Sequence, residues 1–227
     1  MGSEASTSSR FFVLEEGDVG SYYEVSFEKA EPVNRADAPR CQRCGDIIGL
    51  LSWLPPYRVK LELHGEELGD FIDGVGYELL VSERFVEAFR AEGLTGLEGF
   101  HPVEVVRVRR MKKKREPLTV LRYFVVWPCF GRAAVDLVLN RVRFSTPPTC
   151  TECRATGINA THGFVLEPGT WAGEDIFRPR GMQGKVVVSE RFNRFVERHG
   201  LTNMRLTLTE QYVRDPSHLG PAPLPTA

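Results

Sequence analysis

The sequence Val81-Ser82-Glu83-Arg84-Phe85 recurs further along the chain as Val188-Ser189-Glu190-Arg191-Phe192. When residues 81–95 are aligned with residues 188–202 without a gap, eight of fifteen positions are identical, and both segments end in Gly-Leu-Thr. Unrelated segments of this length are not expected to agree so closely. The recurrence predicts that the chain contains two copies of one structural unit.

Each copy begins with a short apolar run that leads directly into a helix. The runs at 77–81 and 186–188 have the composition of buried strands. Ser82 and Ser189 follow them, and a serine in this position caps a helix by accepting a hydrogen bond from a backbone N–H of the next turn. The pattern therefore predicts two strand-to-helix junctions.

The same alignment predicts where both helices end. Glu83 and Glu190 fall in the first helical turn, where the helix dipole favours a carboxylate. Gly93 and Gly200 follow eleven residues after the serines and are typical of C-terminal stops. Because capping accounts for the serine and the glutamate, we do not interpret Ser-Glu-Arg as an active site.

Strand-like runs occupy much of the remaining chain and predict an α+β fold with more strand than helix. They lie at 11–14, 22–27, 58–63, 103–108, 118–124, 135–139 and 204–209. We expect two repeat halves, at 11–110 and 111–215, packed into one compact domain. A flexible leader at 1–10 and a proline-rich tail at 216–227 would flank them.

Four of the five cysteines form two Cys-x-x-C pairs, Cys41 with Cys44 and Cys150 with Cys153, each roughly 40 residues before a repeated segment. Two such turns brought together supply the four sulfurs of a closed, structural Zn²⁺ site. A pseudo-twofold duplication would let the distant pairs meet across its axis. Glycine suits the tight turn after the second cysteine, and the chain has Gly in the first copy but Arg154 in the second.

Other uses of the cysteines stay open at this point. They could be free thiols, a redox pair, or part of a split site that recruits His64 and His162. Neither pair stands at the start of a helix after a strand, the setting that makes a thiolate reactive. No other catalytic motif is present, so we expect a protein that is not an enzyme and has no small-molecule substrate. Cys129 is expected to be a small buried apolar residue.

Charge is distributed unevenly along the sequence. Residues 1–100 contain 9 basic and 19 acidic residues, whereas residues 101–227 contain 20 basic and 11 acidic ones. Seven of the nine residues at 107–115 are basic, and we expect this run in a hairpin loop between strands. No apolar run approaches the roughly 18–20 residues of a membrane span, and residues 1–10 do not have the pattern of a secretory signal. We therefore expect a cytoplasmic protein without a membrane partner.

With Cys41-x-x-Cys44-Gly45, the second Cys-x-x-C and the two Val-Ser-Glu-Arg-Phe segments, the chain resembles the myxobacterial double-CxxCG-motif paralogous family over nearly its full length. Members of that family resemble Sit-type immunity proteins, which are encoded beside polymorphic lipoprotein toxins that kin cells exchange. The resemblance implies an immunity protein that binds and neutralises a cognate toxin. Only the four cysteines are carried over as site residues.

The alternative function is a zinc-containing regulatory protein that binds nucleic acid through the basic run at 107–115. The run has no interleaved aromatic residues for base stacking, so we expect a solvated loop rather than a nucleic-acid contact. If the partner is a nuclease toxin, its basic cleft would dock on the acidic part of the chain, at exposed acids such as Glu66 and Glu67.

Overall fold

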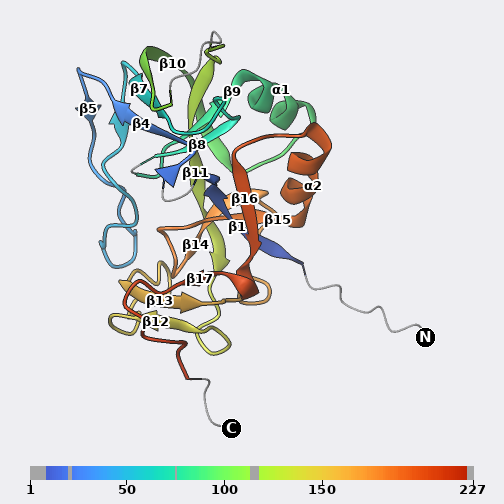
Figure 1. The fold of residues 1–227 in the computed structure, drawn as a ribbon. Helices are drawn as coiled ribbons and strands as arrows, with labels where there is room; N and C mark the ends of the chain where they lie inside the picture. Colours follow the sequence, from blue (N-terminus) through green and yellow to red (C-terminus); the bar gives the residue numbers. More distant parts are fainter. Residues whose placement is uncertain (1–8, 20–21, 75, 113–117, 224–227) are drawn as a thin grey trace.

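The computed structural model describes residues 9–19, 22–74, 76–112 and 118–223, and it shows a strand-rich α+β fold (Figure 1). The predicted fold class is confirmed at this level. The strands are β1 (Phe11–Glu16), β2 (Asp18–Val19), β3 (Tyr22–Tyr23), β4 (Val25–Lys29), β5 (Asn34–Arg35), β6 (Trp53–Leu54), β7 (Arg58–Leu63), β8 (Phe71–Asp73), β9 (Leu79–Ser82), β10 (Leu97–Arg110), β11 (Tyr123–Ala134), β12 (Val142–Phe144), β13 (Ile158–His162), β14 (Ile176–Arg180), β15 (Val186–Ser189), β16 (Met204–Leu208) and β17 (Val213–Arg214). The helices are α1 (Glu83–Ala91), α2 (Glu190–His199) and a short 3₁₀ helix at Thr209–Gln211.

A large curled sheet forms the body of the molecule. Its strands follow the order β16-β1-β15-β14-β11-β10-β7-β4, and β8 and β9 branch from it through the pairing of β9 with β11. The long strand β11 is the centre of this arrangement because it pairs with β9, β10 and β14. A separate sheet, β12-β13-β17, lies at the lower end of the molecule in Figure 1.

The two helices lie close together on one side of the large sheet (Figure 1). Four phenylalanines, Phe85 and Phe89 of α1 with Phe192 and Phe195 of α2, are at most 3% exposed and belong to one core cluster. The rings of Phe85 and Phe195 meet edge to face at 5.6 Å between centroids. Burial of each ring stabilises the fold by roughly 1.5–3 kcal/mol, so the apolar faces of the helices hold them together.

The predicted helix boundaries are confirmed. Ser82 Oγ accepts a hydrogen bond from the N–H of Phe85 at 3.1 Å, and Ser189 Oγ accepts one from the N–H of Phe192 at 3.2 Å. Both serines end a strand and begin a helix. The chain leaves each helix through glycine, with φ of +62° at Gly93 and +54° at Gly200.

Three predictions of secondary structure are wrong, at least in part. Residues 118–122 do not lie in a strand, since β11 begins only at Tyr123. Residues 137–139 form a turn rather than a strand, because the Asp136 carboxylate accepts hydrogen bonds from the N–H groups of Val138 and Leu139. The basic run does not begin in a loop, since Arg107 to Arg110 continue β10 and pair in parallel with β7. Residues 113–115 of that run lie outside the described residues, as do residues 1–8 of the leader and 224–227 of the tail.

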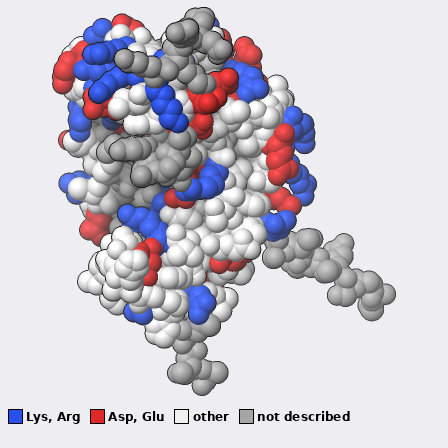
Figure 2. All heavy atoms as spheres, in the orientation of Figure 1, with Lys and Arg blue, Asp and Glu red and all other residues white. Residues whose placement is uncertain are grey.

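The oppositely charged parts of the chain are interleaved in space. Acids within residues 1–100 pair with bases that follow them, as in Glu15–Lys185, Glu62–Arg109, Glu83–Arg122 and Glu92–Arg198. On the face shown in Figure 2, acidic and basic side chains are interspersed over the upper part of the molecule, and the lower end carries few charges. The charge asymmetry of the sequence therefore does not produce one acidic and one basic lobe. No described helix has the length and apolar character needed to cross a bilayer.

Candidate metal centre

The structure brings the two Cys-x-x-C pairs together, although 109 residues separate their equivalent members. The four Sγ atoms all lie within 4.8 Å of one another. Cys41 Sγ is 4.0 Å from Cys150 Sγ, and Cys44 Sγ is 3.7 Å from Cys153 Sγ. None of the five cysteines forms a disulfide bond. The predicted convergence of the four cysteines is confirmed.

Both turns have the same backbone arrangement. The N–H of Gly45 donates to the carbonyl of Cys41 at 2.9 Å, and the N–H of Arg154 donates to the carbonyl of Cys150 at 3.0 Å. Gly45 has φ of +79°, and Arg154 adopts the same left-handed region with φ of +52°. The second turn therefore keeps the geometry that the sequence analysis associated with glycine.

Side-chain contacts hold Arg154 in this unusual conformation. Its guanidinium donates to the carbonyl of Val135 at 2.7 Å and forms an ion pair with Glu167. A residue with a Cβ atom loses roughly 1–2 kcal/mol in the left-handed region, and these contacts offset that cost. The arginine therefore also connects the cysteine turn to Val135, which directly follows β11, and to the segment between β13 and β14.

Backbone N–H groups favour the thiolate form of the leading cysteine in each turn. The N–H of Cys44, followed by that of Arg43, lowers the pKa of Cys41. The N–H of Cys153 makes the largest contribution at Cys150, whose pKa falls to about 6. Thiolate is the form that binds metal, so each turn favours the ligand form of its leading cysteine. Burial among the neighbouring sulfurs raises the pKa of Cys44 and Cys153 instead.

The cluster fits a tetrahedral metal. Zn–S bonds of about 2.3 Å place the sulfurs of a tetrahedral site about 3.8 Å apart. The Sγ–Sγ distances of 3.7 and 4.0 Å between the two pairs are close to this value. Cys41, Cys150 and Cys153 are at most 8% exposed, whereas Cys44 is at the surface. Four thiolates would fill a tetrahedral coordination sphere and would leave no position for a substrate.

The other sequence candidates lie elsewhere. His64 and His162 do not belong to the four-ligand group, and His162 instead contacts Asp215 at 3.0 Å. Cys129 is half-buried rather than fully buried, and its Sγ lies 3.8 Å from the carbonyl of Ile176. Burial raises the pKa of the Cys129 thiol to about 11, so this thiol is protonated at neutral pH.

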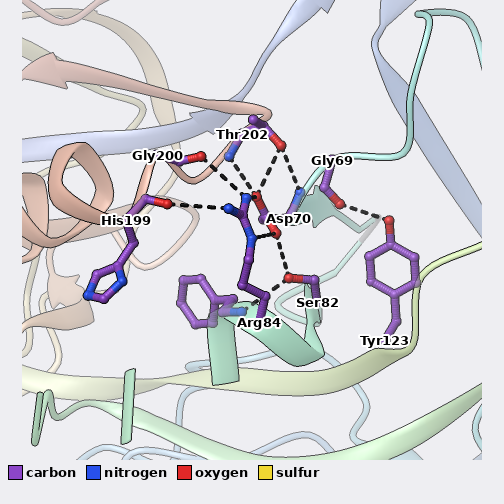
Figure 3. A network of polar contacts seen from close by, with 9 residues as sticks. Gly69, Asp70, Ser82, Arg84, Tyr123, His199, Gly200 and Thr202 are labelled. Atoms are coloured by element: carbon purple, nitrogen blue, oxygen red, sulfur yellow. Dashed lines mark hydrogen bonds and ion pairs between the residues drawn. The ribbon is translucent and has the colours of Figure 1, made fainter. Parts of the chain in front are cut away.

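Sequence reasoning missed the role of the repeated arginines. Arg84 forms a fork whose nitrogens donate to the carboxylate of Asp70 and to the carbonyls of His199 and Gly200 (Figure 3). Asp70 also accepts from Ser82 Oγ at 2.6 Å and from the N–H of Thr202 at 2.9 Å. The start of α1 is thereby fastened to the end of α2.

A second network makes the equivalent contacts between the other two helix ends, the start of α2 and the end of α1. Arg191 donates to the carboxylate of Asp175 and to the carbonyls of Glu92 and Gly93. Asp175 accepts from Ser189 Oγ at 2.9 Å and from the N–H of Thr95 at 3.0 Å. Capping explained the serines and glutamates but not why both copies carry arginine, and that unexplained identity was the signal for these networks.

No protein-family model matches the chain, and a search of the curated proteins finds no match either.

Proposed function

We propose that the chain is an immunity protein that binds and neutralises a cognate polymorphic toxin in the cytoplasm of the cell that receives it. One observation carries the proposal: the two Cys-x-x-C turns on which the family resemblance rests lie together in a single cluster of four sulfurs. Within this proposal the cluster holds Zn²⁺, and the metal has a structural role. The protein acts by binding and not by catalysis.

The proposal includes an internal duplication. It is supported by the matched junctions at Ser82 and Ser189 and by the reciprocal contacts of Arg84 and Arg191 with the opposite helix ends. These contacts link positions that the sequence alignment equates. If the two copies are related in this way, their cysteine turns would face each other. A duplication would then explain how a metal site is built from pairs that are distant in the sequence.

A scaffold that is stabilised by a metal ion suits the recognition of one toxin among similar toxins. A site of four thiolates contributes to folding, since structural zinc sites have apparent binding free energies of roughly 10–16 kcal/mol in small peptides. A rigid surface loses little conformational entropy when a partner docks. Exposed apolar side chains are available for such a contact at Leu137, Val138 and Leu139, which are 43–62% exposed.

The test is co-expression with the toxin candidate encoded beside this gene. We expect the chain to restore growth of cells that produce the toxin and to co-purify with it as a stable complex. A Cys44→Ser, Cys153→Ser double variant should lose both effects, whereas Cys129→Ser should keep them. Growth that is not restored by the wild-type chain, together with no complex in the purified material, would refute the immunity function.

A further inference from the structure

Residues 36–52, which we call the strap, form a loop that leaves the body of the molecule at β5 and returns to it at β6. The N–H of Ala36 donates to the carbonyl of Ser52 at 2.8 Å and closes the base of this loop. In Figure 1 the strap is the light-blue segment that descends from β5 along the side of the sheet. It carries the first cysteine turn near its middle, and it contributes no strand to the large sheet.

The strap is folded largely on itself and meets the body of the molecule around the cysteines. The N–H of Cys41 donates to the carbonyl of Asp46 at 2.8 Å. The N–H of Ile48 donates to the carbonyl of Pro39 at 2.9 Å. Ile48 also packs against the cysteine cluster, and its carbonyl accepts a hydrogen bond from Arg178 of β14 at 3.2 Å. The attachment of the strap to the sheet is therefore concentrated at the metal centre.

A cavity of about 380 Å³ lies between the strap and the sheet. Leu50 and Leu51 line it from the strap, and Trp127 and Cys129 line it from β11. Trp127 and Cys129 are two positions apart in one strand, so their side chains share the face that the strap covers. Both residues are half-buried. The strap therefore stands between this part of β11 and the solvent.

The apolar side chains of the strap do little to hold it in place. Ile47, Leu50 and Leu51 are 46–55% exposed, so they bury little apolar surface against the body. A segment with few buried contacts opens locally at a low free energy. One metal ion bound by both cysteine turns would supply the missing attachment, because it would connect the strap to Cys150 and Cys153 through metal–sulfur bonds.

We propose that the strap is a metal-dependent cover over this part of β11. With the metal bound across both turns the strap is closed, and after metal loss it opens while the large sheet stays folded. The sheet can persist because β5 and β6 pair only with each other in a separate sheet among the described strands. Metal content thereby controls access to the face that carries Trp127 and Cys129. The proposal rests on the zinc site of the proposed function and not on toxin binding.

The test is alkylation of Cys129 in the full chain with N-ethylmaleimide, measured by peptide mass spectrometry before and after treatment with a chelator. Elemental analysis follows the metal content of the same samples. We expect Cys129 to be labelled about tenfold faster after metal removal, because labelling requires the strap to open and its rate follows the open fraction.

The metal-free protein must keep its large sheet for this result to report on the strap. Amide exchange at Val187 and Val188 measures that, since both residues are fully buried in β15, which is paired on both sides. Labelling of Cys129 that does not change on metal removal would overturn the proposal. Labelling that rises only as these amides lose protection would also overturn it, as would purified protein without bound metal.

Two variants test the cover with the metal in place. A Leu50→Ala, Leu51→Ala double variant shortens the side chains that line the cavity from the strap, and it keeps all four cysteines. We expect Cys129 to be labelled about threefold faster than in the wild type, with unchanged metal content. Leu54→Ala is the matched control, because Leu54 is 40% exposed on β6 and does not line this cavity. Equal labelling of Cys129 in the double variant and the control would overturn the proposal.

These outcomes are separate from those of the toxin experiment. A chain that restores growth but is labelled equally with and without metal would refute only the metal-dependent cover. A chain with metal-dependent labelling that neither restores growth nor binds the toxin would refute only the immunity function.

Discussion

The two cysteine turns have the same backbone, but they reach it by different means. After the first turn, Gly45 adopts its positive φ, and no described residue other than its chain neighbours comes within 4 Å of the place where a Cβ would stand. After the second, Arg154 adopts the same region and is fastened to Val135 and Glu167. The comparison shows two ways to hold a left-handed residue after such a turn. One is a glycine, which adopts positive φ freely, and the other is a larger residue whose side chain is held by its neighbours.

The turns also differ in burial. In the second, Cys150 and Cys153 are 8% and 0% exposed, and Gln183 donates to the carbonyl of Cys153 at 2.7 Å. In the first, Cys44 lies at the surface. We infer that the second turn is the preformed half of the site and that the first turn docks on it.

The largest expected effect comes from removing a ligand of the proposed zinc site. Cys44→Ser in the docking turn and Cys153→Ser in the preformed turn should each abolish tight zinc binding, because a structural site needs all four ligands. We expect the melting temperature to fall by more than about 10 °C, since several kcal/mol correspond to this shift in a chain of this size. Elemental analysis and calorimetry measure the two effects.

Cys129→Ser is the control because it removes a thiol outside the cluster and should leave the metal content unchanged.

The comparison of the two cysteine turns predicts a further difference between them. A chelator should increase amide exchange around the first turn more than around the second. Wild-type protein that contains no metal after purification, and that a chelator does not destabilise, would contradict this prediction.

The two Asp–Arg networks provide the next test. Asp70→Asn and Asp175→Asn should each lower the free energy of unfolding by about 2–4 kcal/mol, because each buried carboxylate loses charge-assisted hydrogen bonds. Equal losses are expected, since the contacts of the two networks match one another. Denaturant unfolding measures them, with Asp37→Asn at the surface as a control that should change stability by less than about 0.5 kcal/mol. Losses that differ severalfold would show that the networks are not equivalent.

Acid should weaken the Asp70 network. Although burial raises the pKa of Asp70, hydrogen bonds from Arg84 and Ser82 outweigh it and hold the pKa below its ordinary value of 3.8. A carboxyl group with a lowered pKa contributes stability above pH 3.8, and this contribution is lost as the pH falls through the lower folded-state value. Unfolding measured from pH 5 down to pH 2 should therefore depend less on pH in Asp70→Asn than in the wild type. Equal pH dependence in both proteins would refute this origin of the acid sensitivity.

Local signals made much of this fold predictable. Capping serines and terminal glycines act within one helical turn, so the sequence indicated both helices and their limits. The convergence of the cysteines was predictable because each Cys-x-x-C pair lies roughly 40 residues before a repeated segment, as a duplication would place it. By contrast, Asp70 and Asp175 lie outside the aligned segments. Each is brought to its arginine by long-range strand pairing, β8 with β9 and β14 with β15, so no local pattern pointed to them.

The wrong strand prediction at 137–139 has a similar cause. The apolar residues at 137–139 resemble a strand, but the carboxylate of Asp136 satisfies the next backbone N–H groups locally and turns the chain. In the basic run, pairing of β10 with β7 overrides the expectation of a loop, and Arg109 meets Glu62 at 3.0 Å across the two strands. Long-range pairing, which single-sequence patterns do not specify, decided this segment.

The smallest expected effect returns to the residue after each cysteine turn. Gly45→Ala should cost about 1 kcal/mol, because an alanine is strained at positive φ even though it has space. Arg154→Ala keeps that strain and loses the contacts with Val135 and Glu167, so it should lower stability by about 1–2 kcal/mol. Arg154→Gly loses the same contacts but relieves the strain, and it should be about 1 kcal/mol more stable than the alanine variant.

Chemical denaturation of the wild type and these three variants in zinc-containing buffer measures these differences. If Arg154→Gly and Arg154→Ala are equally stable, the left-handed backbone carries no cost at this position, and anchoring by neighbours is not what maintains the second turn.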